Sequence, residues 1–242
     1  MSGQKLVSWQ KDGVGCVLQN IAYGECRPNQ TGLGRSCSMN YVEGSCQSRL
    51  VVQTPKMYVP FGAKEWEARE SGKPNKWDLV MSFKGNTVPM NMFSQLIQAI
   101  DEANVTYAYE NQEAFFSEKG KSRDIILDRY TPIYNNSNPK YEPKLGTRLD
   151  FRNGAYTGQV YDPSGVQQDM DFVTPHCYVQ ALVEFGSLWV ADKRFGQTIR
   201  TIQMMVHKQD TIRTLAITPM ELDDPPLQGS GGNHAAYEEY TE

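Results

Sequence analysis

The chain has 242 residues, 39% of them hydrophobic and 21% charged, which is the composition of a soluble globular protein long enough to bury a full core. No apolar run reaches the ~18 residues of a membrane span, and the N-terminus lacks an apolar signal core, so we expect neither a transmembrane segment nor secretion. The formal net charge of −4 is unevenly placed, because residues 221–242 hold six acidic residues and no Lys or Arg. The first 220 residues are therefore mildly basic, and the end of the chain is acidic.

The first part of the chain predicts short strands between glycine-rich turns. The candidate strands are Lys5–Trp9, Cys16–Tyr23, Arg35–Tyr41 and Arg49–Gln53. The segment Leu50–Gly62 is rich in β-branched residues, and its two prolines restrict it to a sheet edge or to strand ends. The five cysteines form no Cys-x-x-Cys pair and their number is odd, so the sequence favours free thiols over a zinc site or a disulfide framework.

The central stretch, residues 77–123, holds the clearest pattern. Residues 77–83 place apolar side chains at every second position, which predicts a strand with one face in the core. Pro89 then marks a position where a helix can begin. Apolar residues recur at three- and four-residue spacing from Met92 to Ile100, which predicts one amphipathic helix with a single apolar stripe.

The second half of the chain predicts more strands. Ser122–Arg129 fits either a strand or a short helix. The predicted strands are Lys144–Phe151, Gln159–Tyr161 and Gln197–Lys208, with a hairpin turn at Asn153-Gly154 and a further hairpin, Tyr178–Phe185 with Ser187–Asp192, across Gly186.

These elements predict a mainly β fold, an OB-fold-like β-barrel with one main amphipathic helix inserted between strands. We expect residues 1–220 to form this single domain, with an N-terminal strand extension. Residues 221–242, after Pro225-Pro226 and a Gly-Ser-Gly-Gly run, are expected to be a flexible acidic tail.

The sequence contains no recognisable catalytic site. Its three histidines lack metal-ligand spacing, and there is no phosphate-binding loop, dinucleotide fingerprint or nucleophile-elbow motif. Asp169 and Asp171 flank Met170 and could begin a metal-carboxylate pair, but a solvated turn is the better explanation. We therefore expect a protein that is not an enzyme and that uses neither a metal nor a cofactor.

Aromatic residues interleave with cations from residue 107 onward, which indicates binding of single-stranded nucleic acid. Such binding needs flat rings for base stacking and cations that follow the phosphates. The stacking candidates are Phe115, Phe116, Tyr130, Tyr134 and Trp189. The phosphate-neutralising candidates are Lys119, Lys121, Arg123, Lys144, Arg148, Lys193 and Arg194. In the alternative interpretation the rings belong to the core and the cations to an ordinary solvated surface.

The acidic tail fits the same hypothesis. A flexible anionic end can occupy a cationic groove until nucleic acid displaces it, which frees the tail for protein partners. The candidate partner-binding residues are Asp223, Asp224, Tyr237, Glu238, Glu239, Tyr240 and Glu242. The alternative is a plain solubilising disordered end.

Several motifs, in their order, resemble a known family. They are Val52-Gln-Thr-Pro-Lys-Met57 through Pro60-Phe-Gly62, Leu79-Val-Met-Ser-Phe83, Phe93-x-x-Leu96-x-x-x-Ile100-Asp101 and Ser187-Leu-Trp-Val-Ala-Asp-Lys-Arg-Phe-Gly196. Across roughly residues 48–208 the chain resembles the single-stranded DNA-binding proteins of large nucleocytoplasmic DNA viruses, relatives of the podophage replication type with an acidic C-terminal tail. Two features depart from this pattern, because Phe115-Phe116 replaces the expected Trp-Phe and the tail ends in Glu242 rather than an aromatic residue.

The resemblance implies an OB fold, cooperative coating of single-stranded DNA, homodimers, and contact of the tail with the viral DNA polymerase and other replication proteins. It also implies action at a cytosolic viral replication site or in the host nucleus. We therefore expect a sequence-independent single-stranded DNA-binding protein of viral replication, recombination or repair. The alternatives are a minor capsid-type β-sandwich protein without DNA affinity and a late-transcription regulator that binds duplex DNA.

Overall fold

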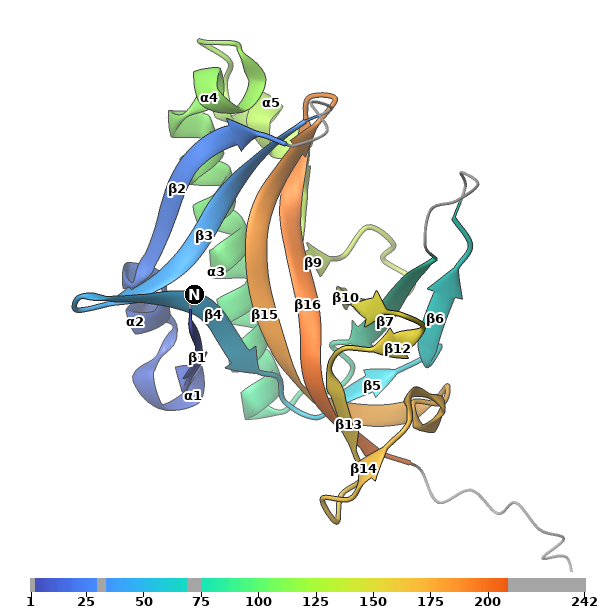
Figure 1. Ribbon diagram of the computed structural model, residues 1–242. Coiled ribbons are helices and arrows are strands. Elements are labelled where there is room, and N and C mark those ends of the chain that lie inside the picture. The colour runs from blue at the N-terminus through green and yellow to red at the C-terminus, as the bar shows by residue number, and fades with distance from the viewer. Residues whose placement is uncertain (1–2, 30–33, 69–74, 209–242) are drawn as a thin grey trace, which may run out of the picture. The chain divides into compact units, whose positions relative to one another are not determined.

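Two long strands, β15 (Cys177–Ala191) and β16 (Arg194–His207), form an antiparallel hairpin through the middle of the structure (Figure 1). The computed structural model describes residues 3–29, 34–68 and 75–208. The hairpin predicted across Gly186 is wrong, because β15 continues through this glycine and turns at Asp192 and Lys193, whose φ angles are 47° and 66°. Gly186 lies instead where the pairing register shifts, so it accommodates a β-bulge rather than a turn.

Five strands close a barrel around one end of this hairpin. Strand β5 (Met57–Val59) pairs with β7 (Lys76–Ser82), which pairs with β10 (Lys144–Leu149). Strand β10 pairs with β16 in parallel, and β15 joins β16 to β5, which closes the ring. Around the ring the strands follow the order β5, β7, β10, β16, β15, which are the first, second, third, fifth and fourth of these strands along the chain. This is the strand order of the OB fold, and it confirms the predicted mainly β, OB-fold-like architecture.

The N-terminal strands extend this barrel into a larger sheet. They are β1 (Gly3–Val7), β2 (Ile21–Pro28), β3 (Arg35–Glu43) and β4 (Cys46–Gln53). One edge of β15 pairs with β3, β4 and β5 in succession. The strand predicted at Cys16–Tyr23 is wrong for most of its length, because α2 (Val14–Gln19), which follows α1 (Trp9–Asp12), occupies residues 14–19. These short helices form because they bury Trp9 and Val17 beside the long helix.

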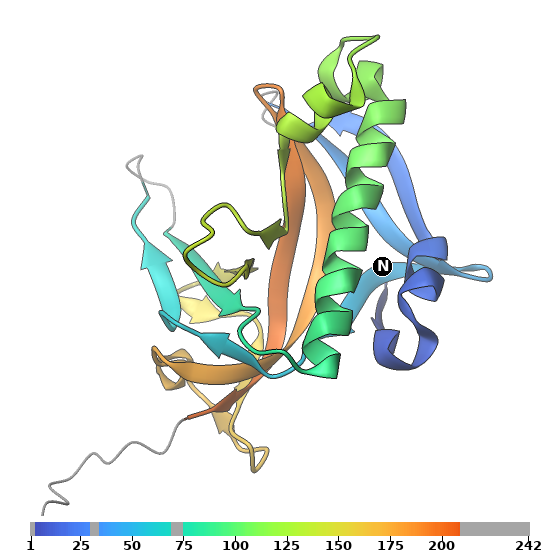
Figure 2. The same ribbon diagram turned by 180° about the vertical axis from the view of Figure 1, so that it is seen from behind.

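The long helix α3 (Val88–Glu110) confirms the predicted amphipathic helix. Thr87 caps its start by accepting a hydrogen bond from the backbone N–H of Met90, and Pro89 occupies its first turn. Its buried side chains are Met90, Phe93, Leu96, Ile97, Ile100, Asn104, Val105 and Ala108. The helix covers one face of the sheet formed by β2, β3, β15 and β16 (Figure 2).

The remaining elements are short. They are β6 (Ala63–Trp66), α4 (Gln112–Phe116), α5 (Arg123–Asp128), β8 (Tyr130–Thr131), β9 (Tyr134–Asn135), β11 (Phe151–Arg152), β12 (Ala155–Tyr156), β13 (Gln159–Tyr161), β14 (Gln167–Gln168) and η1 (Met170–Phe172). Helix α5 settles the open alternative for residues 122–129 in favour of a helix. The β11–β12 hairpin confirms the turn at Asn153-Gly154.

The helices and the metal-binding side chains can be compared with the sequence predictions. None of the helices in the described ranges is long and apolar enough to cross a membrane. Among the same residues no cluster of three or more His, Cys, Asp or Glu side chains could hold a metal ion. The predicted acidic tail, residues 221–242, lies outside the described residues.

Candidate nucleic-acid interface

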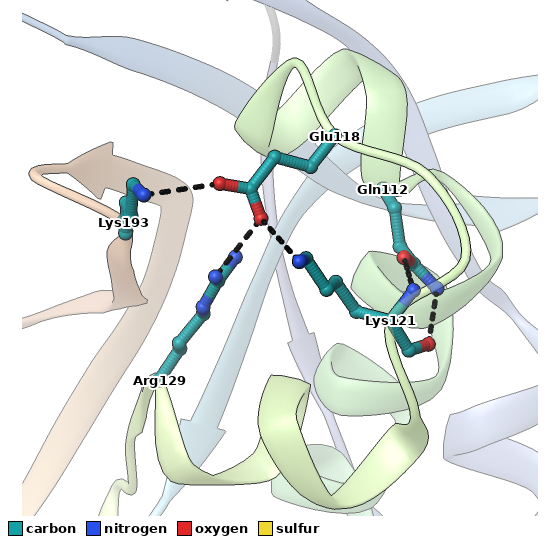
Figure 3. A network of polar contacts seen from close by, with 5 residues as sticks. All are labelled: Gln112, Glu118, Lys121, Arg129 and Lys193. Atoms are coloured by element: carbon teal, nitrogen blue, oxygen red, sulfur yellow. Dashed lines mark hydrogen bonds and ion pairs between the residues drawn. The ribbon is translucent and has the colours of Figure 1, made fainter.

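Three cations converge on one carboxylate at the turn of the long hairpin (Figure 3). The Glu118 carboxylate lies 3.0 Å from Nη2 of Arg129, 3.1 Å from Nζ of Lys193 and 4.0 Å from Nζ of Lys121. Gln112 fixes the backbone of Lys121 by accepting a hydrogen bond from its N–H and donating one to its C=O. Hydrogen bonds from Arg129 and Lys193 hold the pKa of Glu118 below its usual range. The network therefore ties the α4–α5 connection to the β15–β16 turn.

Most of the predicted phosphate-binding cations form an ion pair with a carboxylate of the same chain. Lys121 and Lys193 share Glu118, and Lys119 Nζ lies 2.7 Å from Glu113. Arg123 pairs with Glu102, and Arg148 Nε lies 3.3 Å from Asp150. Arg194 is exposed at the hairpin turn. Charge in this region is thus partly neutralised, and the set of seven cations does not form one continuous patch.

Two of the predicted stacking residues lie in the core, which corrects that part of the predicted site. Phe115 is 2% exposed and Tyr130 is 8% exposed, and both pack in the apolar cluster beneath α3 with Phe195. The Tyr130 hydroxyl donates to Asp101 and accepts from Asn104. Rings enclosed in this way cannot stack on a base, so neither residue belongs to the candidate site.

The other three predicted rings are partly buried. Tyr134 packs on Phe83 with ring centroids 4.9 Å apart, and Phe116 packs on Phe195 at 5.6 Å. Trp189 lies over Gly196, where an added Cβ would come within 2.8 Å of the indole ring. The structure therefore uses one side of each ring for packing and does not bring the three together on one surface.

A different surface, on the outside of the barrel, does bring aromatic and cationic residues together. Tyr178 on β15 lies directly opposite Tyr58 on β5, Tyr58 lies opposite Ser82 on β7, and Ser82 lies opposite Lys144 on β10. The residues on either side of Tyr58 and Tyr178 in the chain are buried, so these two rings point out of the barrel. The four residues form one row across four strands.

Lysines flank the rings of this row. Lys84 Nζ lies 4.9 Å from the ring centroid of Tyr58, and Lys56 Nζ lies 5.7 Å from that of Tyr178. At the other end Lys144 lies between Phe61, which is 57% exposed, and Tyr141, which is 62% exposed. Within the described part of the chain, Lys56, Lys84 and Lys144 form no ion pair. These charges are thus available to an anionic ligand.

The same surface continues along β6, β7 and β10. Lys64 lies opposite Asp78, which lies opposite Arg148. Trp66 is 49% exposed, with Lys64 Nζ 3.9 Å from its ring centroid. Burial raises the pKa of Asp78, against the opposing effect of Arg148 and a neighbouring lysine.

Gly146 lies between the two rows and leaves the centre of this surface uncovered. It is exposed, it lies opposite Val80, and a Cβ added to it would meet no atom within 4 Å. A glycine in a strand can mark a place where a ligand approaches the backbone closely. We call the outward side of β5, β6, β7, β10 and the first residues of β15, with the flanking Lys56, Phe61, Lys84 and Tyr141, the barrel face.

Sequence reasoning identified only Lys144 and Arg148 of this surface. Buried and outward residues alternate in Met57-Tyr58-Val59 and in residues 144–149. This pattern could have predicted that Tyr58, Lys144 and Arg148 point out of the barrel. Their meeting in a row depends on strand pairings between distant segments, which the sequence does not specify.

Comparisons with known proteins give a family and several remote likenesses. The chain is similar in structure to the single-stranded DNA-binding protein of bacteriophage Enc34, solved with single-stranded DNA. The match covers 77% of this chain and 97% of the phage protein, with 10% sequence identity and a TM-score of 0.42. A second match is gp2.5, the single-stranded DNA-binding protein of bacteriophage T7. It covers 70% of this chain and 98% of gp2.5, with 12% sequence identity and a TM-score of 0.44.

Sequence comparison gives one relative and one family. The uncharacterized protein L291 of Acanthamoeba polyphaga mimivirus is 24% identical over 170 residues, which span 67% of this chain but only 27% of that relative. The model of a family described as "Family of unknown function (DUF5871)" matches residues 78–218, which is more than half of the chain. The chain therefore belongs to this family.

Proposed function

We propose that this protein binds single-stranded DNA on the barrel face, without base preference and without catalysing a reaction. The observation that carries the proposal is the row of Tyr178, Tyr58 and Lys144, in which two outward rings are followed by a cation that has no ion-pair partner among the described residues. Flat rings stack on any base and lysines neutralise phosphates of any sequence.

The geometry favours an unpaired strand over a duplex. The faces of the bases are covered by their neighbours in a stacked double helix, whereas a flexible single strand can turn them onto protein rings. On the barrel face Lys84 and Lys56 lie over the rings of Tyr58 and Tyr178, with Nζ 4.9 and 5.7 Å from the ring centroids. One ring and its lysine can therefore bind the base and the phosphate of the same nucleotide.

We further propose that the protein coats exposed single strands during viral DNA replication, recombination or repair. This proposal rests on the resemblance described from the sequence, as do a homodimer and contact of the acidic end with the polymerase and other replication proteins. The residue pattern itself suggests that residues 1–220 form the binding domain and that the acidic end, with Asp223, Asp224, Tyr237 and Tyr240, competes with DNA.

Fluorescence anisotropy with a labelled strand of about 30 nucleotides, at two salt concentrations, tests the proposal. We expect tight, salt-sensitive binding by the full chain and weaker binding by Tyr58→Ala. Tyr109→Ala is the matched control, because Tyr109 is an exposed tyrosine on α3, outside the barrel face. An excess of unlabelled duplex should compete poorly. Absence of binding by the unmodified protein would favour the alternative of a virion structural component.

A further inference from the structure

A hollow of about 580 Å³ opens next to the barrel face, beyond Tyr178. It lies between the start of α3 and the connection from β4 to β5. Lys56 and Tyr178 line it together with Gln10, Gln53 and Gln180. Because Lys56 and Tyr178 also belong to the barrel face, a strand that passes over Tyr178 reaches this hollow directly.

A second hollow of about 320 Å³ continues from the first. Gln53 and Gln180 line both, and Gln203 and Met205 line the second alone. The outward residues of β15 and β16 form its floor, since Gln180 lies opposite Met205 in their pairing. We call the two hollows together the glutamine groove, after Gln10, Gln53, Gln180 and Gln203.

The groove presents four glutamine side chains on a largely apolar, nearly uncharged lining. Lys56 is the one charged residue among the described residues that line it, and no carboxylate lies there. Gln203 donates to Gln159 at 3.0 Å, and Gln180 contacts His207 at 3.1 Å. In the described structure the amides of Gln10 and Gln53 have no hydrogen-bond partner, while the Gln53 backbone is held by Trp9, whose indole N–H donates to its carbonyl at 2.8 Å.

A side-chain amide both donates and accepts, which is the pairing that the edges of nucleobases require. In a site with little charge, phosphate groups contribute little to binding. Its amides can instead form hydrogen bonds with base edges that do not contact the barrel face. We therefore propose that the bases of a bound strand continue past Tyr178 into the glutamine groove, where the amides of Gln53 and its neighbours bond base edges. This inference rests on the proposed function and adds a second subsite, with little charge, to it.

The two subsites should differ in their dependence on salt and on strand length. Phosphate binding releases counterions and therefore weakens with salt, whereas amide hydrogen bonds to bases release none. A short strand can occupy the barrel face alone, and a longer one would also fill the groove. The contribution of the groove should thus appear with long strands and leave the salt dependence unchanged.

Gln53→Leu tests this, because it removes the amide at similar side-chain volume. Gln47→Leu is the matched control, an exposed glutamine at the other end of the same strand β4. Affinities are measured by anisotropy for strands of about 6 and about 16 nucleotides, which span the usual range of OB-fold sites. We expect Gln53→Leu to weaken binding of the longer strand roughly tenfold, with unchanged affinity for the shorter strand and unchanged salt slope.

Each outcome is decisive. If Gln53→Leu binds both strands as the unmodified protein does, the groove inference is wrong and the barrel face stands. Equal weakening for both lengths would overturn the placement of the groove beyond the barrel face. If the unmodified protein binds neither strand, the proposed function itself fails.

Discussion

Tyr58 and Tyr178 occupy directly opposite positions on neighbouring strands, with ring centroids 5.5 Å apart and ring planes tilted by 58°. Lys84 lies over the first ring and Lys56 over the second. His176 joins the pair, because its imidazole stacks on Tyr58 and shares a hydrogen bond with the Tyr58 hydroxyl. The pair gives the barrel face an aromatic centre that is held in place from both strands.

Replacing either tyrosine of this pair by leucine should weaken DNA binding by roughly ten- to hundredfold, because stacking of one base contributes about 1–3 kcal/mol. Leucine keeps most of the apolar volume, so the fold should persist. Anisotropy at one salt concentration measures the loss, and circular dichroism confirms folding. Tyr109→Leu on α3 serves as the control, and a loss of the same size there would contradict the assignment.

Gly146→Leu should block the barrel face without disturbing the fold. A Cβ at this position would meet no atom within 4 Å, and glycine in a strand is less favourable than a residue with a side chain. We expect an unchanged or slightly raised melting temperature together with at least tenfold weaker DNA binding, by the same stacking estimate of about 1–3 kcal/mol per base. Unchanged affinity in a folded Gly146→Leu protein would exclude the centre of this face as the binding surface.

The lysines of the barrel face should determine the salt dependence of binding. Lys84→Gln or Lys144→Gln should reduce the slope of log K against log salt by roughly 0.7 for each phosphate of a single strand that the variant no longer neutralises. Lys119→Gln should leave the slope unchanged, because Lys119 is paired with Glu113 away from this face. The reverse result would support the predicted cations around Glu113 and Glu118 over the lysines of the barrel face.

The parts of the fold that follow from local pattern were predictable. The apolar stripe of α3 and the alternation in β7 each lie within one segment, so the sequence reveals them. Aromatic residues are different, because Phe115 in the core and Phe61 on the surface carry no local mark that separates them. Their placement depends on which distant segments pack against them.

The candidate site shows the same limit. Lys121 and Lys193 look like phosphate-binding residues in the sequence, yet they meet at Glu118 from segments 72 residues apart. Tyr58 and Lys144 meet in one row only because β7 lies between their strands. Period-two alternation predicts which residues point outward, but the pairing of strands decides which outward residues become neighbours.

Glu118→Gln should destabilise the protein at neutral pH and should have progressively less effect in acid. The folded-state pKa of Glu118 is lowered by Arg129 and Lys193, so the stabilisation it provides is present above the unfolded-state value of about 4.3 and is lost as the pH falls through the folded-state value. Thermal unfolding of both proteins at several pH values measures this. A difference in melting temperature that does not shrink as the pH falls below the unfolded-state value of about 4.3 would contradict the ion-pair role.

Asn104→Ala should be strongly destabilising, because Asn104 is fully buried at the centre of a polar network beneath α3. Its carbonyl oxygen accepts from the Tyr23 hydroxyl at 2.8 Å, and its amide donates to Tyr130 and Gln197, each at 2.9 Å. Alanine leaves these three partners without their bonds, and each unsatisfied buried group costs about 1–3 kcal/mol. We expect a loss of roughly 3 kcal/mol in denaturant unfolding.

Asn91→Ala provides the comparison for Asn104, since Asn91 is an exposed asparagine near the start of the same helix and bonds only Asn86 through its side chain within the described structure. Its replacement should change stability by less than about 0.5 kcal/mol. DNA affinity per folded molecule should be the same for both variants, because neither residue belongs to the barrel face. Similar stability losses in the two variants would show that the network beneath α3 contributes no more than an exposed hydrogen bond.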